Sequence, residues 1–264
     1  MNKIFFSIIT VVLNAKFDLI ETIKSLREQK FKNFEYIIID GDSGDGTKEI
    51  IKKNLDIITH YISEKDLGIY DAMNKGLKIS NGEYIGFLNA GDKYTANGLE
   101  TIYKYLNHSN FDFIFGSVMK KELRHGYRKY RIFWNFDFYS SHSSGFFIKK
   151  KSQDELGKYN LRYKISSDYD LFYRMIVKSK MLGLSTKRDE LIGIFKSGTS
   201  YSSKFSFLDH LKEETLIRME NKQNIIFVFI VFTIHFLKNL KKISNEKKII
   251  TFFQSFIEIY KNKL

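Results

Sequence analysis

The sequence predicts an α/β fold built on a doubly wound, mostly parallel sheet that is flanked by helices. In the first hundred residues, short runs of β-branched and aromatic residues alternate with segments whose apolar residues recur every three or four positions. This alternation is typical of parallel sheets with helical connections. A polar or acidic turn follows each of the runs that end at Leu13, Ile39 and Leu88. We therefore expect these turns to meet at the carboxyl edge of the sheet, where open α/β folds bind ligands.

The first three strands are expected where apolar runs lie, at residues 5–13, 34–39 and 57–62. Asp18 precedes Glu21 by three residues, a spacing that predicts a capped helix start after the first strand. That helix would pack through its apolar face, formed by Leu19, Ile20, Ile23 and Leu26. A second helix would follow the acidic turn at residues 40–47.

Residues 63–93 are the stretch around which the predicted site is organised. They contain a polar loop, a helix, an apolar strand at residues 84–88 and a small acidic turn. The helix carries apolar residues at intervals of three and four, namely Ile69, Ala72, Met73, Gly76 and Leu77. Asp92, beside Gly91, ends the turn. A carboxylate in this place suits a divalent cation and the phosphates that it carries.

The second half of the chain is expected to add further elements to the sheet. Strands are predicted at residues 111–118, 144–149 and 192–195, helices at 97–106 and 167–177, and a strand or loop at the sheet edge at 127–138. The helix at 167–177 holds Asp168 and Asp170 in its first turn, where the helix dipole favours negative charge.

We divide the chain into an α/β domain at 1–205 and a helical region at 206–264, and the character of the sequence changes from Asn224. The apolar run at 225–232 is shorter than the roughly 20 residues that span a bilayer. With its flanking lysines and an amphipathic segment at 249–264, it predicts an appendage that associates with a membrane surface. The alternative is a buried helix that completes the core or forms a homodimer contact.

The net charge of +13, from 43 Lys and Arg against 30 Asp and Glu, indicates an anionic partner. Nucleic acid, an anionic membrane and phosphorylated substrates are the candidates. The absence of cysteine excludes disulfides, thiolate nucleophiles and cysteine-bound metals, and it fits a reducing cytoplasm. A Rossmann glycine fingerprint and a Walker lysine motif are also missing.

Six segments carry a family resemblance: SIITV at residues 7–11, DGDSGDGT at 40–47, EKDLGIYDAMNKG at 64–76, GFLNAGD at 86–92, HSSGFFI at 142–148 and SDYDL at 167–171. Together they resemble family 2 inverting glycosyltransferases, in particular the branch that acts in bacterial O-antigen, lipopolysaccharide and exopolysaccharide assembly. The resemblance covers about residues 5–200. It implies a GT-A fold and the transfer of a sugar from a UDP-sugar donor.

The resemblance also implies roles for individual residues. The uridine would be held by Thr10, Asn14, Asp40, Asp42 and Ser43. The diphosphate or sugar side of the pocket would be lined by Asp66, Asn74, Lys75, Asn89 and Gly91. Asp92 would ligate Mn²⁺ or Mg²⁺, and Asp168 would be the general base that activates the acceptor hydroxyl. His142 is a candidate acceptor contact.

Two departures from the family pattern refine the expectation. The acidic Asp-x-Asp motif is here Asn89-Ala90-Gly91, with only Asp92 retained, so one metal ligand would be a neutral oxygen. The Gln-x-x-Arg-Trp signature of processive synthases is missing, which favours transfer of a single sugar. We expect a lipid-linked saccharide acceptor of the undecaprenyl-diphosphate-linked kind, with the protein peripheral on the cytoplasmic face of the inner membrane.

Each candidate residue also has a purely structural interpretation. Asp40 and Asp45 are suited to cap a helix, Asp168 suits a helix N-terminus, and His142 suits a packed core. Two other protein classes remain as alternatives. A nucleotidyltransferase would want a lysine- and glycine-rich first loop, which residues 13–16 do not offer. A nucleic-acid-binding protein would use the positive charge but would not need acids at three strand ends.

Overall fold

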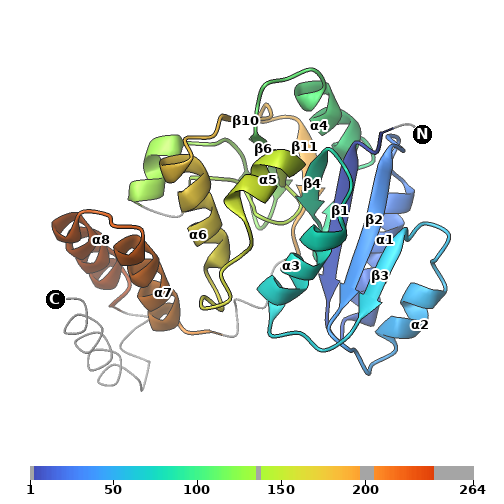
Figure 1. The fold of residues 1–264 in the computed structure, drawn as a ribbon, viewed down its shortest axis with the longest axis horizontal. Helices are drawn as coiled ribbons and strands as arrows, with labels where there is room; N and C mark the ends of the chain where they lie inside the picture. Colours follow the sequence, from blue (N-terminus) through green and yellow to red (C-terminus); the bar gives the residue numbers. More distant parts are fainter. Residues whose placement is uncertain (1–2, 135–137, 197–204, 241–264) are drawn as a thin grey trace.

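A seven-stranded sheet forms the centre of the computed structural model, which describes residues 3–134, 138–196 and 205–240 (Figure 1). The strands run in the order β10-β6-β9-β4-β1-β2-β3. Their bounds are β1 Phe6–Val12, β2 Phe34–Asp40, β3 His60–Ser63, β4 Tyr84–Phe87, β6 Phe113–Phe115, β9 Phe146–Lys149 and β10 Gly183–Ser185. β9 runs antiparallel to both of its neighbours, and the other pairs are parallel. The predicted mostly parallel sheet is confirmed.

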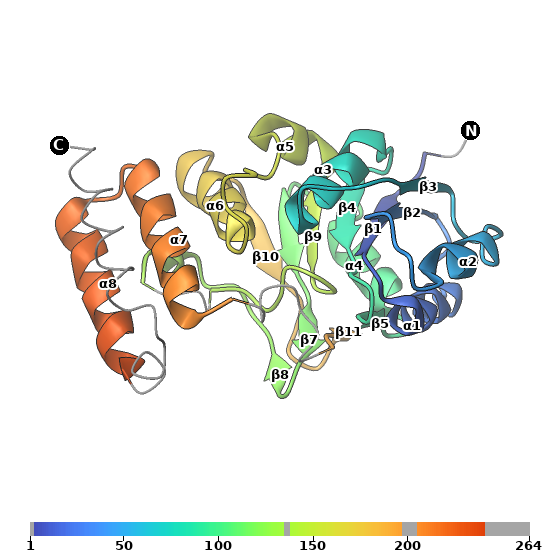
Figure 2. The same cartoon turned by 90° about the horizontal axis from the view of Figure 1, so that it is seen from below.

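Helices cover both faces of this sheet, as Figure 2 shows. All seven residues of β1 are buried, because successive side chains point to opposite faces and both faces are covered. Ile9 and Val11 pack in the core that contains helix α3, whereas Ile8 and Val12 pack in the core that contains α1. On the first face lie α3 Ile69–Ile79, α5 Lys150–Leu156 and α6 Ser167–Tyr173; on the second lie α1 Lys16–Arg27, α2 Thr47–Lys52 and α4 Gly98–Leu106.

The predicted strand at 111–118 is divided between two sheets. β6 ends at Phe115, and the chain then enters β7, Ser117–Met119, in a four-stranded sheet of order β5-β11-β7-β8. The other strands of that sheet are β5 Lys93–Tyr94, β8 Leu123–Arg124 and β11 Leu191–Ile194. Gly116 occupies the switch, and a Cβ there would lie 2.4 Å from Cγ1 of Ile192. Only a glycine lets β11 approach this closely.

Two local predictions are wrong. The segment at 127–138 is neither strand nor loop at its centre but a 3₁₀-helix, η1 Lys129–Phe133, whose Ile132 is buried and accepts a hydrogen bond from the Tyr169 hydroxyl. Asp18 does not cap α1, because the helix begins at Lys16 and the N-cap position is Ala15. The helix predicted at 167–177 is present as α6, continued by the π-helical turn η2 Arg174–Lys178.

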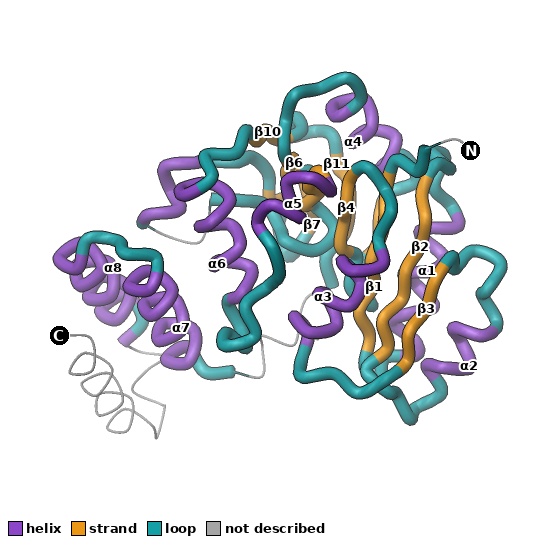
Figure 3. The backbone as a smooth tube through the Cα atoms, viewed as in Figure 1, coloured by secondary structure: helices purple, strands orange, loops and turns teal. Residues whose placement is uncertain are grey.

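Two helices, α7 Phe207–Glu220 and α8 Ile225–Lys238, form a pair beside α6, at the end of the molecule opposite α2 (Figures 1 and 3). Ser206 and Asp209 form a capping box that starts α7. Leu208, Leu211 and Phe232 close the small core between the pair. The segment predicted at 249–264 lies outside the described residues. Across residues 3–134, 138–196 and 205–240, every helix is too short or too polar to cross a bilayer.

Candidate active site

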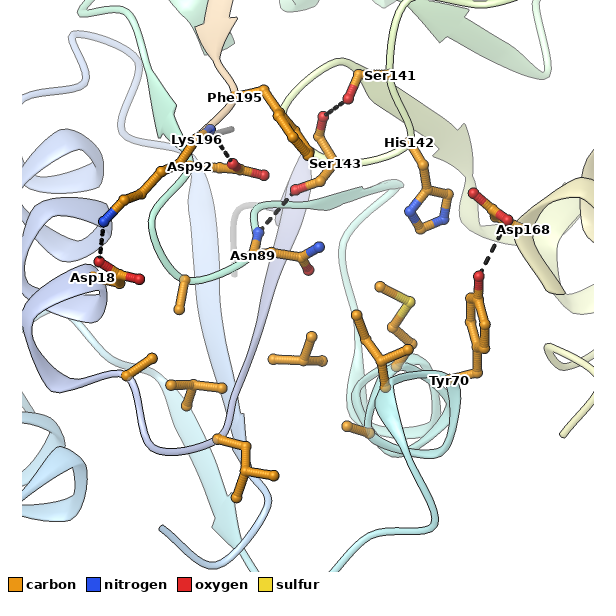
Figure 4. Close-up of a pocket in the computed structure, with 18 of the residues that line it drawn as sticks. Asp18, Tyr70, Asn89, Asp92, Ser141, His142, Ser143, Asp168, Phe195 and Lys196 are labelled. Atoms are coloured by element: carbon orange, nitrogen blue, oxygen red, sulfur yellow. Dashed lines mark hydrogen bonds and ion pairs between the residues drawn. The ribbon is translucent and has the colours of Figure 1, made fainter. Parts of the chain in front are cut away.

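A cavity of about 420 Å³ opens beyond the carboxyl ends of β1 and β4 (Figure 4). Five of the predicted site residues line it: Asp66, Asn89, Asp92, His142 and Asp168. They come from four separate parts of the chain. The close-up shows Asn89 and Asp92 on one side of the cavity and Asp168 on the other. The cavity therefore has two chemically distinct ends.

The turn after β4 forms the first end. Its geometry is fixed by Thr22 of α1, whose hydroxyl accepts from the Gly91 amide at 2.9 Å and donates to the Asp92 carbonyl at 2.9 Å. Gly91 has a φ of +97°, a left-handed conformation that favours glycine. The Asp92 carboxylate is only 3% exposed, and burial raises its pKa to about 6. Oδ1 of Asp92 accepts the Lys196 amide at 2.9 Å.

This turn has the donor set that a divalent cation would need. Oδ1 of Asn89 and Oδ2 of Asp92 are buried and have no hydrogen-bond partner in the part of the chain that the structure describes. Buried polar atoms are nearly always paired, so two orphaned oxygens in one turn point to a ligand. Mg²⁺ and related hard cations take oxygen ligands and keep positions for water and substrate phosphates. Residues 3–134, 138–196 and 205–240 contain no cluster of three or more His, Asp or Glu side chains that could hold a metal ion.

Asp168 forms the second end, in the first turn of α6. The Tyr70 hydroxyl lies 3.1 Å from Oδ1, the Tyr139 hydroxyl lies 3.3 Å from Oδ2, and the Tyr169 amide donates to Oδ1 at 2.9 Å. Burial, and then the charge of Asp168, raise the pKa of Tyr70 well above its usual range, so this hydroxyl stays protonated. The carboxylate is thus oriented by its neighbours while it faces the cavity.

His142 lines the middle of the cavity. Its ring stacks on Phe87 with centroids 5.2 Å apart, and its Nε2 lies 2.7 Å from the Tyr159 hydroxyl. Burial lowers the pKa of His142, so the ring is neutral at pH 7. The packed interpretation and the acceptor-contact prediction are therefore compatible, because the ring is packed and also borders the cavity.

The predicted uridine residues lie beside the cavity, and none of them is among its lining residues. Thr10 and Asp40 are fully buried; Thr10 donates to the Leu88 carbonyl, and Asp40 accepts from the Ser43 amide and the Ser63 hydroxyl. Asn14 binds the same turn through the Ser43 hydroxyl and the Gly44 amide, and Asp42 pairs with Lys48. These contacts hold the rim together, and nucleotide binding by the rim stays a prediction.

Asn74 and Lys75 are two of the residues expected on the diphosphate or sugar side of the pocket. The Asn74 side chain is buried and binds the amide and carbonyl of Tyr159, at 2.9 and 3.0 Å. Lys75 pairs with Glu64 and Asp71. Neither lines the cavity, whereas Asp66, in the loop before α3, does.

The structure adds cavity residues that the sequence did not identify. Asp18 and Lys196 form an ion pair at the end of the cavity that holds Asn89 and Asp92. Lys120 lies with its ammonium 4.5 Å from the centre of the Phe195 ring, and Tyr70 and Tyr139 flank Asp168. Two signals for these residues are present in the sequence. Tyr70 lies in the motif at residues 64–76, and Lys120 begins a basic stretch at residues 120–131.

The ionisation of Glu214, on α7, is affected by the charge of Asp168. Burial, and to a lesser extent the negative charge of Asp168, raise its pKa from 4.5 to about 8, although Arg218 acts in the opposite direction. A carboxyl that keeps its proton in the folded state loses stability as the pH rises from its unfolded pKa to its folded pKa. The free energy of unfolding should therefore fall as the pH rises from about 4.5 to about 8.

Glu214→Gln should not show this loss of stability, because glutamine cannot ionise. We expect the variant to match the wild type near pH 4.5 and to exceed it by about 1–3 kcal/mol in free energy of unfolding at pH 8.5. Urea denaturation at both pH values measures the difference. An equal difference at the two pH values would show that Glu214 is not the titrating group.

Known protein families provide a comparison that does not depend on the cavity. The model described as "Glycosyl transferase family 2" matches residues 7–176, which include the Asn89–Asp92 turn and Asp168. A relative from Mycobacterium bovis, a "PGL/p-HBAD biosynthesis glycosyltransferase", is 30% identical over 182 residues, which cover 64% of this chain and 68% of the relative.

Solved structures share the fold at low sequence identity. Staphylococcus aureus TarS 1-349 in complex with UDP-GlcNAc gives a TM-score of 0.65 at 15% identity, covering 90% of this chain and 73% of that one. The chain spans 39% of a longer TarS chain. The mannosyltransferase PcManGT from Pyrobaculum calidifontis, in complex with GDP-Man and Mn²⁺, gives 0.60 at 12% identity, covering 96% and 79%. These similarities support the α/β fold of the GT-A type.

Proposed function

Because the chain belongs to glycosyl transferase family 2, we propose that it transfers one sugar from a UDP-sugar to a hydroxyl group of a lipid-linked saccharide. The observation that carries the proposal is the arrangement of the cavity, with two orphaned oxygens at one end and the Asp168 carboxylate at the other. The first end suits a nucleotide diphosphate and the second suits an acceptor hydroxyl. Residues 1–205 would perform the transfer, and residues 206–264 would form the associated helical region.

Asp168 is proposed to take the proton from the attacking hydroxyl. The attacking oxygen forms a bond to the anomeric carbon on one face while the bond to the diphosphate breaks on the other. This single displacement inverts the anomeric centre, so an α-linked donor gives a β-linked product. Tyr70 and Tyr139 hold the carboxylate in place.

The donor would lie between the rim at Asn14, Asp42 and Ser43 and the Asn89–Asp92 turn, with Asp66 along the cavity wall. Asn89 and Asp92 would hold Mn²⁺ or Mg²⁺, which when bound neutralises the charge on the leaving diphosphate. Lys120 and Lys196 add positive charge at the same end. The TarS complex with UDP-GlcNAc and the PcManGT complex with Mn²⁺ are consistent with this assignment at the level of the fold.

The reaction is tested by incubating the protein with a panel of UDP-sugars, with Mn²⁺, with Mg²⁺ and with EDTA, and with a lipid-linked saccharide acceptor. We expect metal-dependent turnover of one donor. A folded protein that neither binds UDP nor turns over any donor would overturn the proposal and leave the nucleotidyltransferase and nucleic-acid-binding alternatives. Family membership favours glycosyl transfer over both.

The acceptor side is proposed to lie at the cytoplasmic face of the inner membrane, in the assembly of an O-antigen-type polysaccharide repeat unit. The name of the mycobacterial relatives refers to PGL/p-HBAD biosynthesis, so the O-antigen role rests on the sequence motifs. Helix α8 supports membrane association, because Ile226 and Phe229 on it are 68% and 64% exposed. Apolar side chains near lysines favour an anionic lipid surface.

Phe229→Asp should weaken binding to vesicles that contain anionic lipid. Burial of a phenylalanine stabilises by about 1.5–3 kcal/mol, so we expect a loss of about tenfold or more in the vesicle partition coefficient. Leu55→Asp, which changes an exposed leucine after α2 at the opposite end of the molecule, serves as the matched control. Equal binding by both variants in a co-sedimentation assay would exclude α8 as the membrane contact.

A further inference from the structure

The carboxylate of Glu213, on α7, accepts three backbone hydrogen bonds from one short segment. Its Oε1 accepts the Lys164 amide at 2.8 Å, and its Oε2 accepts the Ile165 and Ser166 amides, both at 2.9 Å. These residues are far apart in the sequence, so the bonds join the C-terminal helix pair to the α/β domain. Hydrogen bonds from amides to an ionised carboxylate are among the stronger ones in proteins.

The segment that Glu213 holds leads directly into α6, which carries Asp168 in its first turn. Ser166 is the N-cap residue of α6, and its own side chain makes no capping hydrogen bond. The first amides of a helix need partners from outside the helix. Glu213 supplies a partner for the residues that set the entry of the chain into α6. The orientation of the first turn, and of Asp168, therefore depends on α7.

A second contact extends this chain of bonds to the Asp168 carboxylate. The Ile165 carbonyl accepts the Tyr70 hydroxyl at 2.6 Å, and the same hydroxyl lies 3.1 Å from Oδ1 of Asp168. A tyrosine hydroxyl has one proton to donate, so the carbonyl and the carboxylate compete for it. Because Glu213 fixes Ile165 through its amide, it keeps the carbonyl in position to accept the proton. Asp168 is then left with a weaker hydrogen bond, and its oxygen stays available as a base.

We infer that Glu213 is a positioning residue for Asp168, and that α7 contributes to the transfer site through this residue. This inference rests on the proposed function, in which Asp168 is the base. Loss of the Glu213 carboxylate would free residues 164–166 and let the Tyr70 proton turn toward Asp168. The base would then be displaced, and its oxygen would be occupied by a hydrogen bond.

Glu213→Gln is the variant that isolates this effect. Glutamine has nearly the same shape, but it has one acceptor oxygen and no charge, so it cannot satisfy all three amides. Glu220→Gln is the matched control. Glu220 lies on the same helix and binds the Tyr163 hydroxyl and Arg162, just ahead of the same segment. The Glu220→Gln substitution removes the same charge from a side chain that bonds Tyr163 and Arg162 rather than residues 164–166.

The experiment compares wild type, Glu213→Gln and Glu220→Gln by hydrogen exchange and by steady-state kinetics. For Glu213→Gln we expect the amides of residues 164–166 to exchange about 10–100-fold faster and kcat to fall about tenfold or more. The KM for the donor should change less than twofold, because the metal end of the cavity is untouched. Glu220→Gln should leave all three quantities unchanged.

Unchanged exchange at residues 164–166, or an unchanged kcat in Glu213→Gln, would overturn the inference. An equal loss in Glu220→Gln would also overturn it, since the effect would then follow from charge alone. If Glu213→Gln does not fold, Glu213→Asp keeps the charge on a shorter side chain, and it should show the same changes at smaller size. If the wild type turns over no donor, the proposed function fails, while the exchange data still decide whether Glu213 holds this segment.

Discussion

Replacing Asp168 with asparagine is expected to lower kcat by about 10²–10⁴-fold, the usual contribution of a general base. Asparagine keeps the shape and the bonds to Tyr70 and to the Tyr169 amide, but it cannot take a proton. Donor affinity should stay within about twofold, because the donor end of the cavity is formed by other residues. Single-turnover kinetics together with calorimetric titration of UDP separate the two quantities.

Asp170→Asn provides the matched control for this change. Asp170 lies in the same turn of α6, but its carboxylate binds Arg174 and the Asn221 side chain and does not line the cavity. We expect the control to lose some stability, because its ion pair is lost, and to keep kcat within about threefold. An Asp168→Asn variant with near wild-type kcat would show that another group accepts the proton.

The second large effect is expected at Asp92. Asp92→Asn preserves an oxygen for the Lys196 amide but removes the only ionised ligand of the proposed cation. Because a Lewis acid at the leaving group contributes several kcal/mol, kcat/KM should fall by about 10²–10³-fold. The concentration of Mn²⁺ that gives half-maximal activity should rise in parallel, and EDTA should inactivate the wild type.

The control here is Asp154→Asn, which changes an exposed carboxylate on α5 that pairs with Lys150. It should leave both the metal titration and kcat/KM unchanged. Calorimetry with Mn²⁺ and UDP gives the affinity without any need for turnover. Equal Mn²⁺ affinity in wild type and Asp92→Asn would place the cation elsewhere or exclude it.

Local pattern was enough to predict the sheet and the edge at which the site lies. The runs that became β1, β2 and β4 are buried on both faces, so their apolar sequence is nearly continuous and easily recognised. Their turns fall together for a topological reason, since parallel strands present their carboxyl ends at one edge. Asn89 and Asp92, which follow β4, accordingly line the cavity at this edge.

The parts that could not be predicted depend on contacts between distant segments. The Asp18–Lys196 ion pair joins residues 178 positions apart, and Glu213 meets Ile165 across 48 positions. No periodicity encodes such pairs. The division of the strand at Gly116 is similar, because it follows from the approach of Ile192. The position of Asn74 also depends on a distant segment, since its partner is the backbone of Tyr159, 85 positions away.

The direction of β9 has a consequence for how substrate range can change. As the one antiparallel strand of the seven-stranded sheet, β9 begins at the edge where its parallel neighbours end. The residues just ahead of it, Ser141 to Ser143, therefore arrive at the cavity, and the Ser143 hydroxyl accepts the Asn89 amide at 2.9 Å. His142, the candidate acceptor contact, belongs to this loop, whereas Ser143 connects the loop to the turn that holds Asn89. Under the proposed function, a change at His142 would therefore be expected to alter acceptor recognition, and a change at Ser143 to disturb the donor end.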